Sequence, residues 1–461
     1  MMKRSFAPAR FGRRVLATGA ALLALGGLGA CDGLLDVENP QAIDPEQLND
    51  PAYLTLLTFG VMGDFQRAFD DVAVYTGLFT DELRNHATFS EEPLIETRAV
   101  TPDNGTIGGG VYAQLQRARG LADTTAQIFR SVRGDSVATD LRFARVQAYS
   151  GISIVLMGEV LCEAPLNNSR PYTPQELFRD FALPRLNEAI AVATAARAVG
   201  AAVNPSTTAS RALVEGADSI INFARVGAAR AALNLNDKPL AIQYASPVPL
   251  AFRFSAFYSE NSAEENNLVD ARLRAAVNSS VSGTPFEALV NMDPRVPIPT
   301  ATRTAVGSGQ QVFVPRSPSA YSTFTGTLPG GDFSRASSIR VASGLEARYI
   351  RAEAEGPTAE NIAFIESRRV IAPGTTPASA TQPTTAANYF SNLRDQRRRD
   401  FYLDAHRLGD LRRYQAQYGA GIESFNQFQT GPVSGAPGLA FTEQYCLPVN
   451  RAEMTSNPHY Q

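Results

Sequence analysis

The helical period of this chain is clearest in residues 142–166, RFARVQAYSGISIVLMGEVLCEAPL. In and just before this stretch, apolar or small side chains recur at three- and four-residue steps, namely at Leu141, Ala144, Ala148, Ile152 and Val155. That spacing places them on one face of an α-helix. The stretch is therefore predicted to form a long helix that buries this face.

Similar segments lie on both sides of this helix. The same spacing begins at Val111, and Arg133-Gly134-Asp135 separates the two segments, which predicts a helical hairpin. A second pair is predicted at residues 174–199 and 208–233, followed by a short helix at 239–245. Consecutive hairpins of this kind indicate tetratricopeptide-like stacking, in which each pair buries its apolar stripe on the next.

The two ends of the chain also carry helical signals. Asp44-Pro45-Glu46 combines an N-cap residue, a proline suited to the first helical position and an acid in the first turn, which predicts a helix start. That helix is expected to reach about Phe69, with a second short segment at residues 71–85. Towards the C-terminus, helices are predicted at residues 345–354, at 358–371 and, as one long helix, at 386–418.

Residues 246–343 differ from the rest because they are rich in Pro, Gly, Ser and Thr, with scattered aromatics. A structureless loop of this length is improbable inside a compact domain, so an irregular inserted subdomain is predicted. The whole pattern predicts a mostly α fold with about four tetratricopeptide-like helical hairpins. The helical scaffold is expected at residues 44–245 and 342–420, and the loop-rich insertion at 246–341.

The 461-residue chain is 44% hydrophobic and 19% charged, as is usual for a folded globular protein. Its formal net charge is −3, and the five basic residues among the first 30 leave −8 for residues 31–461. An acidic body does not suit a nucleic-acid binder, which needs a basic face. No nucleic-acid partner is expected.

The N-terminus has the order of a secretory signal, with basic residues up to Arg14 and an apolar run from Val15 to Leu28. This run is too short to span a bilayer, which needs about 20 residues. Leu28-Gly29-Ala30-Cys31 resembles the lipobox of bacterial lipoproteins, in which the cysteine receives a diacylglycerol. We expect residues 1–30 to be removed as a signal peptide and Cys31 to anchor residues 31–461, one domain, to a membrane.

Two further cysteines remain, Cys162 and Cys446, which is an even number suited to an oxidising compartment. A disulfide between them is predicted. Two buried thiols that behave as small apolar side chains are the alternative.

Four segments together resemble the SusD/RagB-like outer-membrane lipoproteins. They are CDGLLDVENPQAIDPEQL from Cys31, residues 142–166, LEARYIRAEAE from Leu345, and LRDQRRRDFYLDAHRLGDLRRYQ from Leu393 with LPVNRAEMTSNP from Leu447. They span almost all of residues 31–461 in the family's order.

The resemblance implies a non-catalytic, lipid-anchored protein on the outer face of the outer membrane. It would form a hinged lid over a TonB-dependent, SusC-like transporter barrel, capture an oligomeric nutrient and deliver it for uptake, without a cofactor. The fold implied is four tetratricopeptide-like helical pairs that support an irregular binding face.

Catalytic and metal chemistry have little support in the sequence. The three histidines, His86, His406 and His459, are far apart and in no metal-ligand spacing. The arginines of residues 394–413 alternate with acids, which is typical of a solvated or ion-paired helix face. Adjacent acids such as Glu264 and Glu265 do not define the two separated carboxylates of a glycosidase. An anchored extracellular enzyme that degrades glycans or peptides is kept as the alternative function.

The resemblance places the ligand site on the loop Thr80–Gly110 and on the insertion Ser246–Ser343. The candidate binding residues there are Asp81, Arg84, Asn85, Phe89, Tyr321 and Phe324. For each aromatic, a place in the core of the insertion is the competing interpretation. The chain has no tryptophan, the largest stacking surface for a sugar ring, which favours peptides or short oligosaccharides over starch-like polymers.

Overall fold

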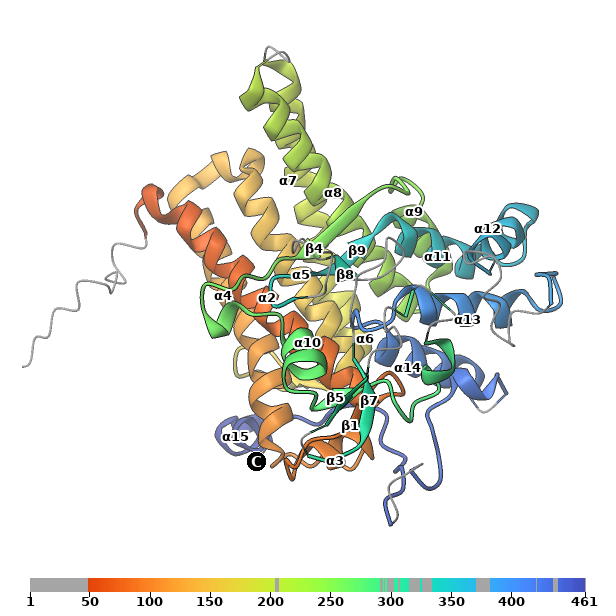
Figure 1. Cartoon of the computed structure of the whole chain (residues 1–461). Helices are drawn as coiled ribbons and strands as arrows, with labels where there is room; N and C mark the ends of the chain where they lie inside the picture. Colours follow the sequence, from red (N-terminus) through yellow and green to blue (C-terminus); the bar gives the residue numbers. More distant parts are fainter. Residues whose placement is uncertain are drawn as a thin grey trace, which may run out of the picture. The chain divides into compact units, whose positions relative to one another are not determined.

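A computed structural model describes most of the chain from residue 49 onward (Figure 1). The described residues are 49–203, 207–290, 293, 295–296, 302–305, 307–314, 324–325, 334–369, 382–419, 421–433 and 438–460. Residues 51–461 form one compact unit. The signal segment, Cys31 and the predicted helix start at Asp44 lie outside the described residues.

Long antiparallel helices form the first half of this unit (Figure 1). They are α2 (Leu54–Phe79), α4 (Ala113–Arg133), α5 (Leu141–Val160), α7 (Leu183–Ala202) and α8 (Thr208–Asn234). Each packs on the next along the chain, α2 on α4, α4 on α5, α5 on α7 and α7 on α8. The two predicted helical hairpins are confirmed, and the mostly α, tetratricopeptide-like fold class with them.

Local sequence signals start several of these helices. Asp140 is the N-cap of α5, and its carboxylate accepts a hydrogen bond from the Arg142 amide at 3.0 Å. Ahead of α7, the short helix α6 (Pro174–Glu176) begins with a capping box between Thr173 and Glu176. Single-turn π-helices, η3 (Ile107–Tyr112) and η5 (Leu177–Ala182), lead into α4 and α7.

The first long helix differs from its prediction. A break near Phe69 was expected, but α2 runs without interruption to Phe79. The acidic residues Asp70 and Asp71, which follow Phe69, do not end the helix. Asp70 is buried, and its carboxylate accepts a hydrogen bond from the Leu268 amide at 2.8 Å. The insertion therefore provides the partner that keeps this polar side chain inside the protein.

Short strands and turns make up the insertion. A three-stranded antiparallel sheet has the order β4 (Arg253–Ala256), β9 (Ser338–Ser343), β8 (Phe324–Thr325), and β6 (Thr302–Thr304) pairs with β7 (Gln311–Phe313). Between β4 and β6 lie four short helical elements, η6 (Ala263–Glu265), α10 (Leu268–Asp270), η7 (Ala271–Ala275) and η8 (Glu287–Leu289), and the strand β5 (Ser279–Ser280). Elsewhere the short elements are η2 (Pro51–Tyr53), β1 (Arg84–Asn85), α3 (Glu92–Glu96), η4 (Gly134–Thr139), β2 (Ala164–Pro165), β3 (Pro171–Tyr172), α9 (Lys238–Ala245), η10 (Ser424–Asn426), α15 (Arg451–Ser456) and η11 (Pro458–Tyr460).

The C-terminal scaffold contains α11 (Gly344–Glu355), α12 (Ala359–Arg369), α13 (Tyr389–Asp400) and α14 (Arg407–Tyr418). The prediction of one long helix over 386–418 is wrong, because the chain turns between α13 and α14. Leu403 and Ala405 adopt positive φ angles of 56° and 65° there. The Leu403 amide donates to the buried Glu82 carboxylate at 2.8 Å, so a contact with a distant segment stabilises the turn.

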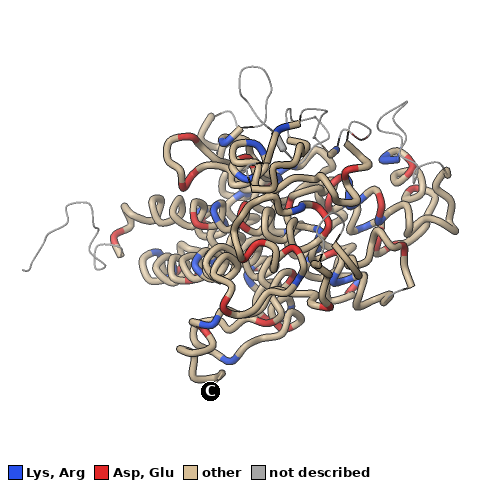
Figure 2. Tube along the Cα trace, turned by 60° about the horizontal axis from the view of Figure 1, so that its bottom comes forward, with Lys and Arg blue, Asp and Glu red and all other residues tan. Residues whose placement is uncertain are grey.

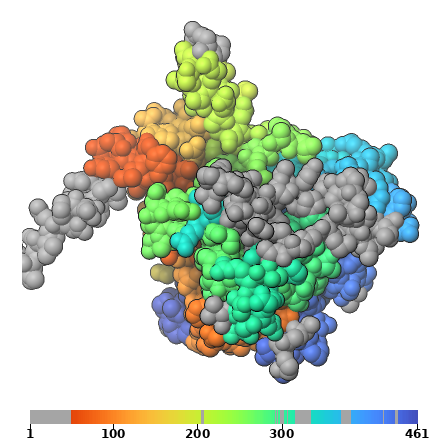
Figure 3. All heavy atoms as spheres, viewed as in Figure 1, coloured from red at the N-terminus to blue at the C-terminus, as the bar shows by residue number. Residues whose placement is uncertain are grey.

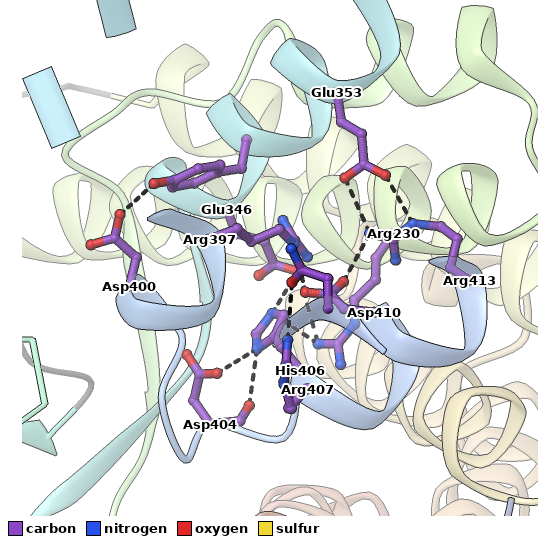
Figure 4. Close-up of polar contacts among 12 residues, drawn as sticks. Arg230, Glu346, Glu353, Arg397, Asp400, Asp404, His406, Arg407, Asp410 and Arg413 are labelled. Carbon is purple, nitrogen blue, oxygen red and sulfur yellow. Dashed lines mark hydrogen bonds and ion pairs between the residues drawn. The ribbon is translucent and has the colours of Figure 1, made fainter. Parts of the chain in front are cut away.

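Six of the seven arginines of α13 and α14 are buried, and the seventh, Arg412, is half-buried. Arg397 and Arg413 both pair with Asp410, and Arg399 pairs with Asp395 and Asp293. Figure 4 shows Arg397, Arg413 and Asp410 beside His406. The sequence pattern of residues 394–413 indicated either a solvated or an ion-paired helix face, and ion pairing is observed. Figure 2 shows acidic and basic positions interspersed along the whole described chain.

A disulfide bond joins Cys162, just after α5, to Cys446 in the C-terminal tail. Backbone hydrogen bonds flank it, since the Cys162 amide donates to the Leu447 carbonyl at 2.9 Å and the Leu447 amide donates to the Val160 carbonyl at 2.8 Å. The bond ties the tail to the central helix. Among the helices of the described residues, none has the length and apolar character needed to cross a membrane.

Candidate ligand-binding site

The loop after α2 and the insertion, which the sequence singled out separately, lie together. Strand β1 pairs antiparallel with β5, with Arg84 opposite Ser280 and Asn85 opposite Ser279. The His86 amide extends this pairing by donating to the Asn278 carbonyl at 2.7 Å. We call residues 84–92 and 272–283 the loop junction.

The polar candidates near the loop junction are used within the protein. Asp81 is buried and forms a two-point ion pair with Arg407, at 2.7 Å for both contacts. Arg84 pairs with Glu96, and the backbone amide of Asn85 donates to the same carboxylate at 3.1 Å. The Asn85 side chain donates to the Ala87 carbonyl at 3.4 Å and accepts from the Ala87 amide at 3.0 Å. These contacts account for the three side chains without a ligand.

The aromatic candidates have different positions. Phe89 is 54% exposed, and the Arg272 guanidinium carbon lies 5.6 Å from its ring centre. The backbone of Phe324 lies in β8, where it pairs with Ile339. Tyr321 lies outside the described residues. Phe89 is therefore the predicted aromatic that the described structure presents to solvent.

A groove of about 390 Å³ lies between α2 and the start of the insertion. Its α2 wall consists of Phe59, Met62, Gly63, Gln66 and Arg67, and its insertion wall consists of Phe257, Tyr258, Ser259, Glu264 and Glu265. In Figure 3 the green atoms of the insertion lie next to the red atoms of α2. We call this the α2 groove.

Two phenylalanines border the α2 groove with large exposed surfaces, Phe59 at 57% and Phe257 at 67%. Tyr258 fixes the two walls to each other, because its hydroxyl donates to the Gln66 carbonyl at 2.9 Å. Burial raises the pKa of Tyr258 well above its ordinary value, so this hydroxyl stays a donor at neutral pH.

The polar groups of the α2 groove carry both signs of charge. Arg67 is exposed and, within the described residues, forms no ion pair within 4.0 Å. Hydrogen bonds from its own backbone and from Ser262 lower the pKa of Glu264, which is therefore ionised at neutral pH. Glu265 accepts a hydrogen bond from Ser259. Exposed rings beside donors and acceptors are the composition of a small-molecule site.

The sequence reasoning missed the α2 wall of the groove. Phe59, Met62, Gly63 and Gln66 have the i, i+3, i+4, i+7 spacing of one helical face. The buried stripe of α2 includes Leu54, Val61 and Phe65, which follow a separate face. A second apolar stripe on a helix that already has a buried one was the available signal, because a scaffold helix needs only one.

Within the described residues, no group of three or more His, Cys, Asp or Glu side chains is arranged to hold a metal ion. Two histidines are buried, His86 and His406, and the more deeply buried His406 is enclosed by Asp404, Glu346 and Arg230 (Figure 4).

Comparison with solved structures identifies the fold. A laminarin-binding SusD-like protein matches with a TM-score of 0.60 and 15% identity, over 89% of this chain and 99% of that chain. A SusD/RagB family protein from Bacteroides thetaiotaomicron matches at 0.56 and 15% identity, over 87% and 94%. A structure with xylogluco-oligosaccharide matches at 0.55 and 13% identity, over 89% and 98%.

The chain therefore has the SusD-like fold, and the resemblance found in the sequence is confirmed at the level of the fold. These matches cover nearly the whole of the solved proteins. No family model and no curated protein matches the sequence itself.

Proposed function

We propose that this protein is a non-catalytic SusD-like lipoprotein that binds a short oligosaccharide and delivers it to a TonB-dependent, SusC-like transporter in the outer membrane. The α2 groove is the observation that carries this proposal. Its exposed rings, Phe59 and Phe257, suit the C–H faces of sugar rings, and its mixed polar groups suit hydroxyls. The fold supports it, since similar structures include a laminarin-binding protein and one solved with xylogluco-oligosaccharide.

The groove chemistry favours binding over hydrolysis. A glycosidase needs two carboxylates that flank the scissile bond, about 5–10 Å apart. The acids of the α2 groove, Glu264 and Glu265, are both on one short turn of the insertion wall. The opposite wall contributes Gln66 and Arg67 instead, which can orient a ligand but do not complete a carboxylate pair.

Binding assays on glycan and peptide arrays test the proposal, with purified protein and with measurement of released products. We expect saturable binding of short neutral oligosaccharides and no products. Binding of peptides without binding of any glycan would show that the ligand is a peptide and not an oligosaccharide. Product release at even about 1 per second, at the low end of the enzyme range, would show an anchored enzyme instead.

Three matched variants locate the site. Phe257→Ala and Phe59→Ala should each weaken oligosaccharide binding, because each removes a stacking surface of the α2 groove. Phe89→Ala removes a similarly exposed ring at the loop junction and should leave binding unchanged. Loss of binding in Phe89→Ala alone would place the site at the loop junction. Leu250→Ala, at an exposed apolar residue outside the groove, controls for general surface effects.

A further inference from the structure

Arg412 differs from the other arginines of α13 and α14, because its guanidinium forms no ion pair within the described residues. Each of the others lies within 4.0 Å of a carboxylate, namely Arg394, Arg397, Arg398, Arg399, Arg407 and Arg413. Burial lowers the pKa of Arg412 to about 10, with Glu159 acting in the opposite direction. The side chain is still a cation at neutral pH.

One side of this guanidinium is held by the end of α5. Its Nη1 group donates to the carbonyl oxygens of Gly158 at 3.1 Å, Glu159 at 2.6 Å and Leu161 at 2.9 Å. These carbonyls belong to the last turn of the helix or follow it, where helical partners are missing. The contacts fix the position and the plane of the group.

The other side of the guanidinium has unused donors. The Nε and Nη2 groups of Arg412 have no hydrogen-bond partner in the described part of the chain. Neither nitrogen is fully buried, so solvent reaches both of them. An Nε–H and Nη2–H pair matches the two oxygens of a carboxylate.

Arg412 lines a pocket of about 270 Å³ between α5, the segment that leads into α7, and α14. Gln175 and Gln415 also line it, and their side-chain amides form no hydrogen bond within the described residues. Phe178 and Tyr445 contribute ring surface. The pocket therefore combines a fixed cation, two free amides and apolar walls.

The remaining charges at this pocket are neutralised. Glu159 forms a two-point ion pair with Arg230, at 2.7 and 2.5 Å. Arg413 pairs with Glu353 at 3.1 Å for both contacts. Among the described residues that line the pocket, Arg412 therefore carries a charge that no carboxylate neutralises.

We propose that this pocket binds a small carboxylate, with the free side of Arg412 on the two carboxylate oxygens and the amides of Gln175 and Gln415 on adjacent polar groups. The volume is just below the range of about 300–1,000 Å³ for small-molecule sites, so it suits one sugar acid or one amino-acid residue. None of its lining residues belongs to the loop junction or the α2 groove. The proposal is independent of the proposed function.

Calorimetric titration of the purified full chain tests this assignment with two carboxylate probes, glucuronate and N-acetylglycine. Glucose and N-acetylglycinamide are their neutral counterparts. We expect saturable binding of at least one carboxylate, none of the neutral compounds at this pocket, and weaker binding at high salt. Binding of glucuronate alone would indicate that the pocket takes a sugar acid. Binding of N-acetylglycine alone would indicate the carboxyl end of a peptide. Binding of both probes would indicate a site that recognises the carboxylate itself.

The decisive variant is Gln415→Glu, which places a carboxylate one helical turn from Arg412 in the same pocket. It should occupy the free side of the guanidinium and reduce probe binding by at least about tenfold, the worth of one charge-assisted hydrogen bond. Arg412 and its contacts with α5 are kept, so folding is preserved. Gln417→Glu makes the same change of charge on the same helix outside the pocket and should bind as the wild type does. Absence of carboxylate-dependent binding, or equal binding in Gln415→Glu and the wild type, would overturn the proposal.

Discussion

The carboxylate of Asp81 and the guanidinium of Arg407 form a buried two-point ion pair, with Oδ1 2.7 Å from Nε and Oδ2 2.7 Å from Nη2. Asp81 follows the end of α2, and Arg407 is the first residue of α14. Nη2 of Arg407 also donates to the Phe425 carbonyl at 2.6 Å. The pair therefore connects the first and last long helices of the described scaffold.

Asp81→Asn should destabilise the protein by about 3–5 kcal/mol, because it leaves the Arg407 charge buried without its partner. Urea unfolding measures this change. Asp103→Asn breaks the exposed pair with Arg451 and should have little effect. A stable Asp81→Asn protein with weakened ligand binding would instead assign Asp81 to the ligand.

His406 should make stability depend on pH above neutrality. Burial and Arg230 lower its pKa, but the carboxylates of Asp404 and Glu346, at 2.7 and 2.9 Å, outweigh them and raise it to about 9. A histidine with a raised pKa contributes its full stability below the unfolded value of about 6.5. That contribution, at most about 3 kcal/mol, should be lost as the pH rises through 9.

NMR titration of the histidine ring protons checks this directly. His406 should remain charged at pH 8, whereas burial lowers the pKa of His86, which should titrate below its ordinary value. The variants His86→Gln and His459→Gln assign the three histidine resonances. A neutral His406 at pH 7 would contradict the prediction.

Gly151 permits the close packing of α5 on α7. A Cβ at this position would lie 2.6 Å from Cγ of Leu186, so Gly151→Ala should cost about 1–3 kcal/mol by overpacking. Gly120 in α4 has no atom within 4 Å of such a Cβ. Gly120→Ala should stabilise the protein by about 0.5–1 kcal/mol, because alanine is the better helix former. Thermal unfolding of the two variants should show shifts of opposite sign.

The bond between Cys162 and Cys446 closes a sequence separation of 284 residues. Replacing both cysteines by alanine should lower the free energy of unfolding by up to about 5 kcal/mol on the chain-entropy model. Reducing agent should lower the stability of the wild type in the same direction and leave the double variant unchanged. Free thiols at both positions in the oxidised, denatured wild type would show that the bond is absent.

Lipidation at Cys31 should determine where the protein is found. Cys31→Ala removes the acceptor thiol of the lipobox-like sequence and should give a soluble or unprocessed chain on cell fractionation. Protease treatment of intact cells then distinguishes an outward-facing wild type from an inward-facing one. A variant that stays on the membrane in high salt with the mature mass would refute lipid anchoring at this residue.

The local part of the fold was predictable from the sequence. The boundaries of α4, α5, α7 and α8 follow from apolar periods and from breaks such as Arg133-Gly134-Asp135. The turn between α13 and α14 was not predictable, because the helical pattern continues through it. The Leu403 amide is held there by Glu82, and a local pattern contains no information about such a distant partner.

The candidate site divides in the same way. The sequence alone indicated that residues 80–110 and 246–343 do not form long scaffold helices, which favours these segments for ligand recognition. That placement of the site stays a prediction. Asp81 was chosen as a ligand residue because it is a charged side chain on such a loop. Only the tertiary structure showed it buried against Arg407, because a charge pattern is the same for a solvated and an ion-paired residue.

The sequence by itself determined the helical hairpins, because hydrophobic periodicity acts between residues three and four positions apart. It also determined the pair of cysteines available for a disulfide. The tertiary structure decided which side chains lie opposite one another. It places Phe59 across the α2 groove from Phe257, and it places Arg412 at the end of α5 without a carboxylate partner. These relationships join segments far apart in the chain, and their energies depend on burial and partners that exist only once the helices have packed.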